Sequence, residues 1–501
     1  MKFFKIIFLF NFIFLKLNCN FGDHGDVSSK TIFNDIMPFT SGFPERIENS
    51  QYIHDINKHE NKFFFSTTIL YSMSKNNEGL SSYFSSNGKK DFTLFGGADN
   101  YLNTNQYKFR RDLDTSPFNI NDESFFSISK INYYSSIKAL GLNFFYNFYE
   151  NKENNSDLLI KLFCPFYNIN HKIKIKESIK NQKEINLYSL KKSLSNKNYK
   201  YVNFNFCEDG IENNKIGNFE LNFSYRNLIS NNCFMENILG LIFPNEDPIN
   251  RKNNENSLFF PRIGNNGHWG IQYEGHLTII FYEQFDYAIR GTLLSNSTYL
   301  IPSDQKRVFD LMHRPWSRYL QTYKNLNKID QKIEPLCNFL NLKCKVSPNF
   351  SFTSTTEIGL YKENLNLSLG YTMYARQAEG IQIKENISDL VLKSGDFLKI
   401  NSNDNYINSL RSINLRNIFN DQKISGDPSE NEFYNLSIIK PEDIDISSAS
   451  HPAVFMGIFY GKIGFEKSNS FFANLGISYR YCYNNSALRY KTLWGSLGFE
   501  F

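Results

Sequence analysis

The sequence lacks long apolar runs, and this absence excludes a bundle of membrane helices. After the first 18 residues, no segment reaches the ~18 consecutive apolar residues that a spanning helix needs, and the mean hydropathy is −0.44. An excess of one charge is also missing, because 55 Lys and Arg against 50 Asp and Glu give a net charge of only +5. Nucleic-acid binding needs clustered basic charge. We therefore expect no nucleic-acid partner.

Cysteine is scarce, with 7 residues in 501. A chain of this size with so few cysteines has no disulfide framework. Cys337 and Cys344 could close one small loop, or they could lie unpaired on one face of a short helix. No Cys and His spacing fits a zinc site, so we predict neither a metal site nor a cofactor.

Aromatic residues are abundant, in contrast. The 49 Phe and 30 Tyr bring the aromatic content to 16%, against 21% charged residues. Disordered chains are poor in aromatic residues. The composition therefore indicates a large folded chain that is polar on average and rich in Phe and Tyr.

The N-terminus resembles a secretory signal. Lys2 and Lys5 precede an almost entirely apolar stretch, Ile6–Leu15, which has the length of a signal-peptide core. We predict a signal peptide over residues 1–19. The residues before Cys19 do not match the usual lipidation pattern, so a plain signal peptide is favoured over a lipoprotein.

Strict two-residue alternation is the dominant pattern of the chain, and the last segment shows it best. A strand points successive side chains to opposite faces. The even positions of this segment are largely polar, and the odd positions are Leu493, Gly495, Leu497, Phe499 and Phe501. A last strand that ends on Phe resembles the C-terminal strand of bacterial outer-membrane barrels, which the barrel-assembly machinery recognises. We therefore expect that machinery to be a partner, through Phe501.

The same alternation recurs along the chain. From Phe125 onward it predicts twelve strands, and two poorer segments, 63–73 and 91–97, would raise the count to fourteen. Short turns near 151–156, 227–232, 283–285, 362–363 and 467–469 alternate with long connections over 165–215, 244–268, 296–349 and 377–452.

Outer-membrane barrels have short turns on one side and long loops on the other. A soluble β-sandwich also alternates, but its core favours Val, Ile and Leu over Phe and Tyr. The predicted fold class is therefore all-β: a closed antiparallel up-and-down transmembrane β-barrel of 12–14 strands over residues 61–501, with long external loops and a little helix. Residues 20–60 would be a periplasmic N-terminal segment or a plug.

Three hairpins give registers that agree with the alternation. A turn over 467–469 would pair Phe465 with Phe471, and a turn over 362–363 would pair Leu360 with Leu365. Of the long loops, Asp304 could cap a helix running toward His313. The loop 377–452 is polar and without period, which predicts a solvated surface loop.

Four polar residues of the third hairpin, over 269–295, share the even register that would face the lumen: Glu274, His276, Asp286 and Arg290. A turn over 283–285 would set Thr278 opposite Arg290, and Arg290 would then be diagonal to His276. These four residues could form a charged constriction that selects solutes, or a structural network inside the lumen. A hydrolase would need a nucleophile such as that of G-x-S-x-G, which is absent, so we predict no enzyme.

The stretch from Ile216 to Glu274 resembles a known family. Gly217-Asn218 begins one strand, Gly240–Pro244 ends the next, and a Gly-rich return, "RIGNNGHWG", leads into the third. This phrase is similar to that of outer-membrane channels of the FadL-like and aromatic-degradation-associated transport families. The resemblance implies a barrel that passes small molecules.

These observations predict a protein of the bacterial cell outer membrane that contacts outer-membrane lipid and serves as a passive channel for small solutes. The alternative is a surface-exposed adhesin or host-contact protein whose loops carry the function. A soluble periplasmic β-protein is the third hypothesis.

Overall fold

The structure is a computed structural model, and it describes residues 63–74, 91–95, 113–114, 120, 125–151, 156–181, 189–195, 209–245, 260–312, 317–319, 321–324, 334–387, 390–392, 437–467, 471–482 and 488–500. The expected signal peptide (1–19), the segment 20–60 and Phe501 lie outside the described residues.

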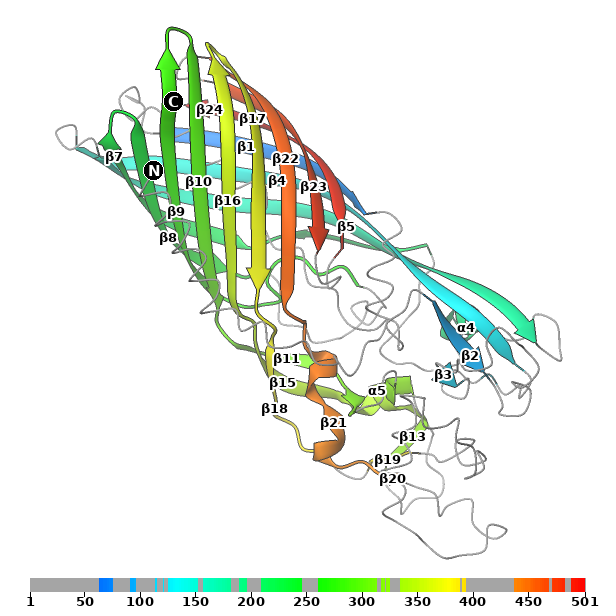
Figure 1. Ribbon diagram of the computed structural model, residues 1–501. Coiled ribbons are helices and arrows are strands. Elements are labelled where there is room, and N and C mark those ends of the chain that lie inside the picture. The colour runs from blue at the N-terminus through cyan, green and yellow to red at the C-terminus, as the bar shows by residue number, and fades with distance from the viewer. Residues whose placement is uncertain are drawn as a thin grey trace, which may run out of the picture.

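Twelve antiparallel strands close into a barrel (Figure 1). Around the ring they follow the order β1, β24, β23, β22, β17, β16, β10, β9, β8, β7, β5 and β4, and β4 pairs again with β1. Their bounds are β1 (Phe63–Ser74), β4 (Phe126–Asn151), β5 (Ser156–Asn181), β7 (Phe219–Ser230), β8 (Cys233–Phe243), β9 (Gly270–Gln284), β10 (Tyr287–Leu300), β16 (Asn349–Lys362), β17 (Leu365–Arg376), β22 (Val454–Lys467), β23 (Phe471–Cys482) and β24 (Tyr490–Glu500).

The alternating pattern decides which side of the wall each residue faces. On β24, Leu493 is 51% exposed on the outside, whereas its neighbour Trp494 is 3% exposed on the inside. The same contrast recurs around the ring, and Leu369, Ile358 and Ile477 are among the most exposed apolar side chains of the outer face. Outward aromatic rings also pair across strands, as in Phe65 with Phe144, whose centroids lie 5.0 Å apart.

The prediction that the Phe- and Tyr-bearing faces form the outside of a closed sheet is therefore confirmed. An apolar outer band with aromatic residues is the surface that lipid requires. None of the helices among the described residues is long and apolar enough to cross a bilayer.

The strand count of twelve was expected, but from a different set of strands. The segments 125–134 and 140–148 belong to one strand, β4, because no turn interrupts the chain between them. The segment at Phe63 supplies the missing member, since β1 pairs with both β24 and β4. The segment at Asp91 forms β2 (Asp91–Phe95), which pairs with β4 outside the ring.

The predicted hairpin registers were wrong by two residues, although their faces were right. Phe465 pairs with Ala473 rather than with Phe471, and Leu360 pairs with Leu367 rather than with Leu365. A shift of two residues leaves every side chain on its face, so the alternation could not reveal it.

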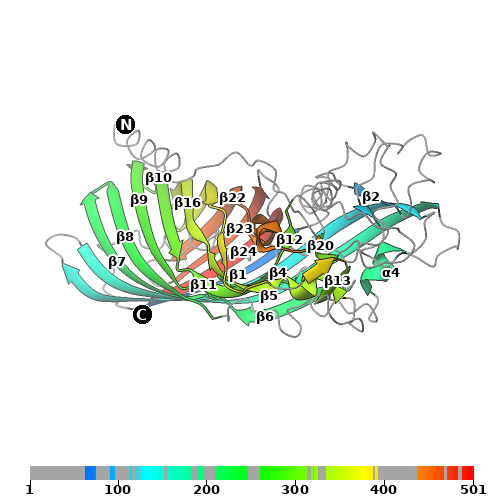
Figure 2. The ribbon, with the colours of Figure 1, turned by 90° about the horizontal axis from the view of Figure 1, so that it is seen from below.

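Strands β4 and β5 are 26 residues each, more than twice the length of β24. Their outer ends, residues 126–134 and 172–181, continue beyond the ring as a two-stranded antiparallel ribbon that we call the arm. Figures 1 and 2 show the arm reaching sideways from the long-loop end of the barrel. In the arm β4 pairs with β2, which in turn pairs with β3 (Leu113–Asp114). Next to the arm β5 pairs with β6 (Ile211–Ile216), and α4 (Leu190–Ser195) contacts β5.

The described parts of the long loops 301–348 and 377–453 pack together at the same end and form what we call the cap. Its buried side chains, Phe309, Leu311, Leu336, Leu340, Leu342, Cys344, Val346, Leu390, Ile439, Ile444 and Ala449, make a hydrophobic core of their own. The cap contains β11 (Ser303–Val308), β12 (Asp310–Leu311), η5 (Ser317–Tyr319), β13 (Gln321–Lys324), β14 (Glu334–Pro335), α5 (Leu336–Phe339), β15 (Asn341–Ser347), β18 (Gly380–Ile383), β19 (Leu390–Leu392), β20 (Ser437–Ile438), η9 (Pro441–Asp443), β21 (Ile444–Asp445) and η10 (Ile446–Ala449).

The cap corrects two expectations. The residues after Asp304 form strand β11, not a helix, because they pair in antiparallel register with β15. The described ends of the loop 377–452 are not simply solvated, since Ile439 and Ile444 are buried in the core of the cap.

Cys337 and Cys344 are free thiols and form no disulfide with each other. Cys344 Sγ donates to the Gln305 carbonyl, and Cys337 lies on α5.

A second apolar cluster lies on the inner side of the ring. It joins lumen-facing residues of β1, β4, β5, β17, β22 and β24 to residues of the arm and to Val308 and Cys337 of the cap. Its lumen-facing members include Leu70, Ile137, Met456, Ile458 and Trp494. We call it the internal apolar cluster, and it gives one arc of the wall an apolar inner surface toward the cap.

Candidate functional site: the charged wall of the lumen

The rest of the inner wall is charged, mainly on four neighbouring strands. Lys161 on β5, Arg226 on β7, Glu236 on β8, and Glu274 and His276 on β9 are all buried. Each lies between apolar or outward-facing neighbours, as Lys161 does between Ile160 and Leu162. Period two therefore carries these charges to the lumen while the flanking residues face lipid.

Opposite charges meet in contact along this wall. Arg226 Nη2 lies 2.9 Å from Asp157 Oδ2, and Lys161 forms an ion pair with Glu236. Glu236 Oε2 in turn lies 3.2 Å from His276 Nδ1. Buried charges are tolerated only when they are paired in this way, and each of these charges has an oppositely charged group beside it.

His276 lies between two carboxylates. Besides Glu236 on the neighbouring strand, it contacts Glu274 on its own strand, with Nε2 2.5 Å from Oε1. The other oxygen of Glu274 accepts a hydrogen bond of 2.8 Å from the Asn296 side chain. All these groups lie inside the ring, where fixed dipoles and charges act on any solute that passes.

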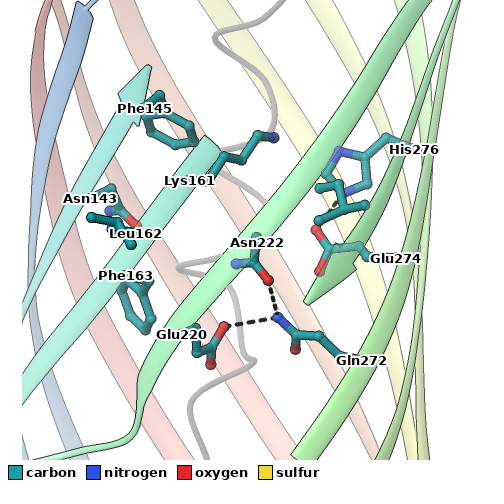
Figure 3. Close-up of a pocket in the computed structure, with 11 residues that line it drawn as sticks. Asn143, Phe145, Lys161, Leu162, Phe163, Glu220, Asn222, Gln272, Glu274 and His276 are labelled. Carbon is teal, nitrogen blue, oxygen red and sulfur yellow. Dashed lines mark hydrogen bonds and ion pairs between the residues drawn. The ribbon is translucent and has the colours of Figure 1, made fainter. Parts of the chain in front are cut away.

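A cavity opens against this wall (Figure 3). Below the histidine, Gln272 Nε2 donates to Glu220 Oε2 at 3.1 Å and to Asn222 Oδ1 at 2.7 Å. On the other side of the cavity lie the rings of Phe145 and Phe163. The cavity therefore combines a polar wall with an aromatic one.

The strands farther round the ring carry further pairs. On β16, Glu357 accepts from the Tyr460 hydroxyl at 2.7 Å and lies 3.2 Å from Lys462 Nζ. The Arg290 guanidinium lies 4.3 Å from the centre of the Tyr361 ring. Such cation–π contacts stabilise a cation that is partly removed from water.

The structure brings together two of the four residues singled out from the sequence. Glu274 and His276 are in contact, whereas Arg290 lies nearer the turn and packs on Tyr361. Asp286 lies in the exposed turn itself and does not face the lumen. That Glu274, His276 and Arg290 form a constriction stays a prediction.

The geometry of the turn explains why Arg290 does not lie opposite Thr278, as the sequence had predicted. It consists of Phe285 and Asp286, so that Gln284 pairs with Tyr287. A two-residue turn would set even residues opposite odd ones, but a β-bulge between Ile289 and Arg290 restores the match. Thr278 therefore faces Thr292 rather than Arg290, with their hydroxyl oxygens 3.3 Å apart.

Sequence reasoning missed Lys161, Glu236 and the Asp157–Arg226 pair. Lys161 lies in "LLIKLF" and Glu236 lies in "CFMENILGLIF", each as the only charge of a largely apolar run, whereas Asp157 and Arg226 lie in more polar stretches. A lone charge in an alternating strand signals a lumen position. Which of these charges lie side by side depends on the register of the strands, so the sequence alone could not predict the contacts of Lys161 and Glu236.

A second ionic cluster holds the cap to the barrel. Glu379 lies 3.3 Å from Arg307 Nη2, 2.8 Å from His451 Nδ1 and 3.5 Å from Arg376 Nη2, all buried. Burial alone would raise the pKa of Glu379, but His451 and the two guanidinium groups outweigh it and hold that pKa well below its usual value. Glu379 is therefore ionised, and its ion pairs hold the loop segments that carry Arg307 and His451 against the end of β17, which carries Arg376.

His268 belongs to the same region. Its Nδ1 lies 2.9 Å from the Ile301 carbonyl oxygen, and its Nε2 lies 2.7 Å from Gln305 Nε2. Burial lowers the pKa of His268 to about 4, so the ring is neutral at pH 7. Among the described residues, no group of three or more His, Cys, Asp and Glu is placed to hold a metal ion.

No protein-family model matches the sequence, and no curated protein matches it. Among solved structures, an outer membrane channel from Pseudomonas putida F1 is similar at 8% identity and a TM-score of 0.40, over 89% of this chain and 97% of that one. The CymD monoaromatic hydrocarbon channel is 8% identical, with a TM-score of 0.26 over 88% and 89% of the two chains. The translocator domain of the autotransporter NalP from Neisseria meningitidis is 6% identical, with a TM-score of 0.29 over 91% and 95%. Since identities and scores are this low, the assignment to the outer-membrane type of barrel rests on this chain's own closed ring and apolar outer face.

Proposed function

We propose that the chain is a passive outer-membrane channel for small solutes. The observation that carries the proposal is the contrast between the two faces of one closed ring, apolar outside and lined by paired charges inside. Lipid faces one side, and the polar inner wall offers hydrogen bonds to water and solutes on the other.

The charged wall is the route we propose. On the opposite arc, the internal apolar cluster packs Met456 and Trp494 with Val308 of the cap and occupies the inner surface there. A solute would pass along Lys161, Glu236 and His276 instead. Because Phe145 and Phe163 line the same cavity, the solutes that suit it best are small molecules with both polar and apolar parts.

Planar-bilayer recordings test this proposal. The purified chain should give discrete conductance steps, and replacement of Lys161 by Met should make the channel more cation-selective, seen as a shift of reversal potential in a salt gradient. The control is Lys491→Met, since Lys491 is exposed on the outward face of β24. If the protein gives no steps and no solute flux, the channel proposal is lost.

Host contact remains the second candidate, and the cap favours it, because a loop region with its own hydrophobic core can present a fixed surface. Deletion of the whole segment 377–452 would also remove Glu379 and His451, which anchor the cap. Deletion of residues 393–436, which lie outside the described residues, is the cleaner experiment. A channel should keep its conductance, whereas an adhesin should lose attachment.

Recognition by the barrel-assembly machinery is proposed on the sequence of the last strand. The β24 strand alternates as far as Phe499, and Phe501 continues its odd register. Deletion of Phe501 should lower the amount of folded barrel in the membrane, judged by heat-dependent gel mobility. Replacement by Tyr should preserve it.

A further inference from the structure

The outward face of β5 changes character along its length. From Leu158 to Phe166, which is 38% exposed, its even positions are apolar and belong to the lipid-facing band. After two asparagines, the same face carries Lys172, Lys174 and Lys176 on the arm. Because the strand keeps period two, these lysines continue the surface that touches lipid.

Strand β4 adds to this basic surface. Lys130 is directly opposite Lys176, and Tyr134 is opposite Lys172. Like charges directly across a strand pair are unfavourable. Asp91 of β2 lies opposite Lys130 on the other side of β4. Lys174 Nζ lies 5.5 Å from the centre of the Tyr134 ring. We call Lys172, Lys174 and Lys176 the lysine strip.

The inner face of the arm is packed. Ile131, Tyr133 and Ile173 are buried in the internal apolar cluster, together with Leu190 and Leu194 of α4. The strip is therefore presented by a supported pair of strands rather than by a free loop. A supported backbone places the three ammonium groups in one row, so the backbone itself need not become ordered when anions bind.

The direction of the arm indicates the partner. It continues the lipid-facing wall at the long-loop end and reaches sideways from the barrel (Figures 1 and 2). Its outward face therefore follows the membrane surface just beyond the apolar band. Anionic headgroups at a membrane surface attract lysines that lie within a Debye length.

We propose that the lysine strip binds the phosphate groups of anionic lipids in the external leaflet. This inference rests on the barrel crossing a membrane with its long loops outside, and it is independent of channel activity. Bound phosphates would fix the height and rotation of the barrel in the membrane, as interfacial cations do elsewhere.

The test uses the full chain in neutral detergent and measures lipid binding by native mass spectrometry. The probe is an acylated glucosamine disaccharide that carries two phosphates, compared with the same lipid after removal of its phosphates. We expect the phosphorylated lipid to bind more tightly. The variant K172Q/K174Q/K176Q should weaken that binding about tenfold or more at low ionic strength, whereas K172R/K174R/K176R should retain it.

The matched control is K306Q/K343Q/K345Q on the cap, where Lys306 is likewise opposite Lys343 in a strand pair. This control should bind the lipid as the unmodified chain does, and heat-dependent gel mobility should show that both variants are folded. Equal binding by the strip variant, or equal binding of the lipid without phosphates, overturns the proposal.

Two further ligands, inorganic phosphate and heparin, test whether the lysine strip binds an anion other than the lipid headgroup. If inorganic phosphate occupies the strip as tightly as the lipid does, the headgroup is not the ligand and the proposal is lost. If the strip variant loses binding of heparin but keeps binding of the lipid, the strip serves a sulfated polysaccharide, as a host-contact protein would require.

Discussion

His276 Nδ1 on β9 lies 3.2 Å from Glu236 Oε2 on β8, inside a closed barrel wall. Glu236 also pairs with Lys161 of β5 and accepts from Ser224 of β7. One carboxylate therefore links four strands. The predictions that follow test this wall, the packing of the ring, its lipid face and the cap.

Glu236→Gln should destabilise the barrel by about 3–5 kcal/mol, because it leaves the Lys161 ammonium buried without its charge partner. Urea unfolding of the protein in lipid vesicles measures the free energy. Lys161→Gln combined with Glu236→Gln should recover part of the loss. Glu283→Gln, at the exposed end of β9, is the control and should change the free energy by less than about 0.5 kcal/mol. Equal effects of the two single changes on Glu236 and Glu283 would contradict the pairing.

Gly476→Ala should disturb the inner packing of the ring. A Cβ atom at Gly476 would lie 2.1 Å from Trp494 Cζ2, so the indole must move. We expect a cost of about 1–3 kcal/mol and a change in tryptophan fluorescence. At Gly275 the nearest atom to an added Cβ is Ser295 Oγ, at 3.4 Å. The Gly275→Ala control should therefore leave both readouts close to those of the unmodified chain, and similar shifts in the two variants would argue against this packing.

Leu369→Arg should cost about 2–4 kcal/mol if the outer face touches hydrocarbon. Leu369 is 69% exposed on β17, several residues from the turn. Leu365 is on the same face, next to the short turn, and Leu365→Arg should cost only about 0–1 kcal/mol because Arg can reach the interface there. Unfolding in vesicles gives both values. A water-facing surface would tolerate both substitutions equally.

Acidification should loosen the region around His268. Its pKa is about 4 in the folded chain and near 6.5 when unfolded. Between these values the unfolded chain binds more protons, so stability decreases as the pH falls from about 6.5 to 4, by up to about 3 kcal/mol. His268→Gln should remove this part of the pH dependence, measured as the difference in unfolding free energy from the unmodified chain. An unchanged pH profile in the variant would refute the assignment.

The sequence predicted the faces of the strands better than their partners. Period two identifies Leu493 as outward and Trp494 as inward whatever the neighbour is. Register is different, because a shift by two residues keeps every face, and Phe465 was assigned to Phe471 instead of Ala473. The bulge at Ile289/Arg290 shows the same limit, since only backbone pairing reveals it.

The candidate site was predicted in part for the same reason. Glu274 and His276 are two positions apart on one strand, so their contact needs no register. Glu236 and Lys161 approach them across β8, β7 and β5, and that approach depends on three pairings at once. The cap was beyond prediction, because its core joins Phe309 to Ile439 over long stretches without period.

The pairing of β1 with β24 has a consequence for biogenesis. The earliest and the latest strands of the ring are hydrogen-bonded to each other, so the seam can form only after the final strand has been delivered. A nascent or truncated chain would present two open edges, which favour aggregation. Proteases that degrade such intermediates could recognise the unpaired backbone amides of β1 and β24, which become hydrogen-bonded once the barrel closes.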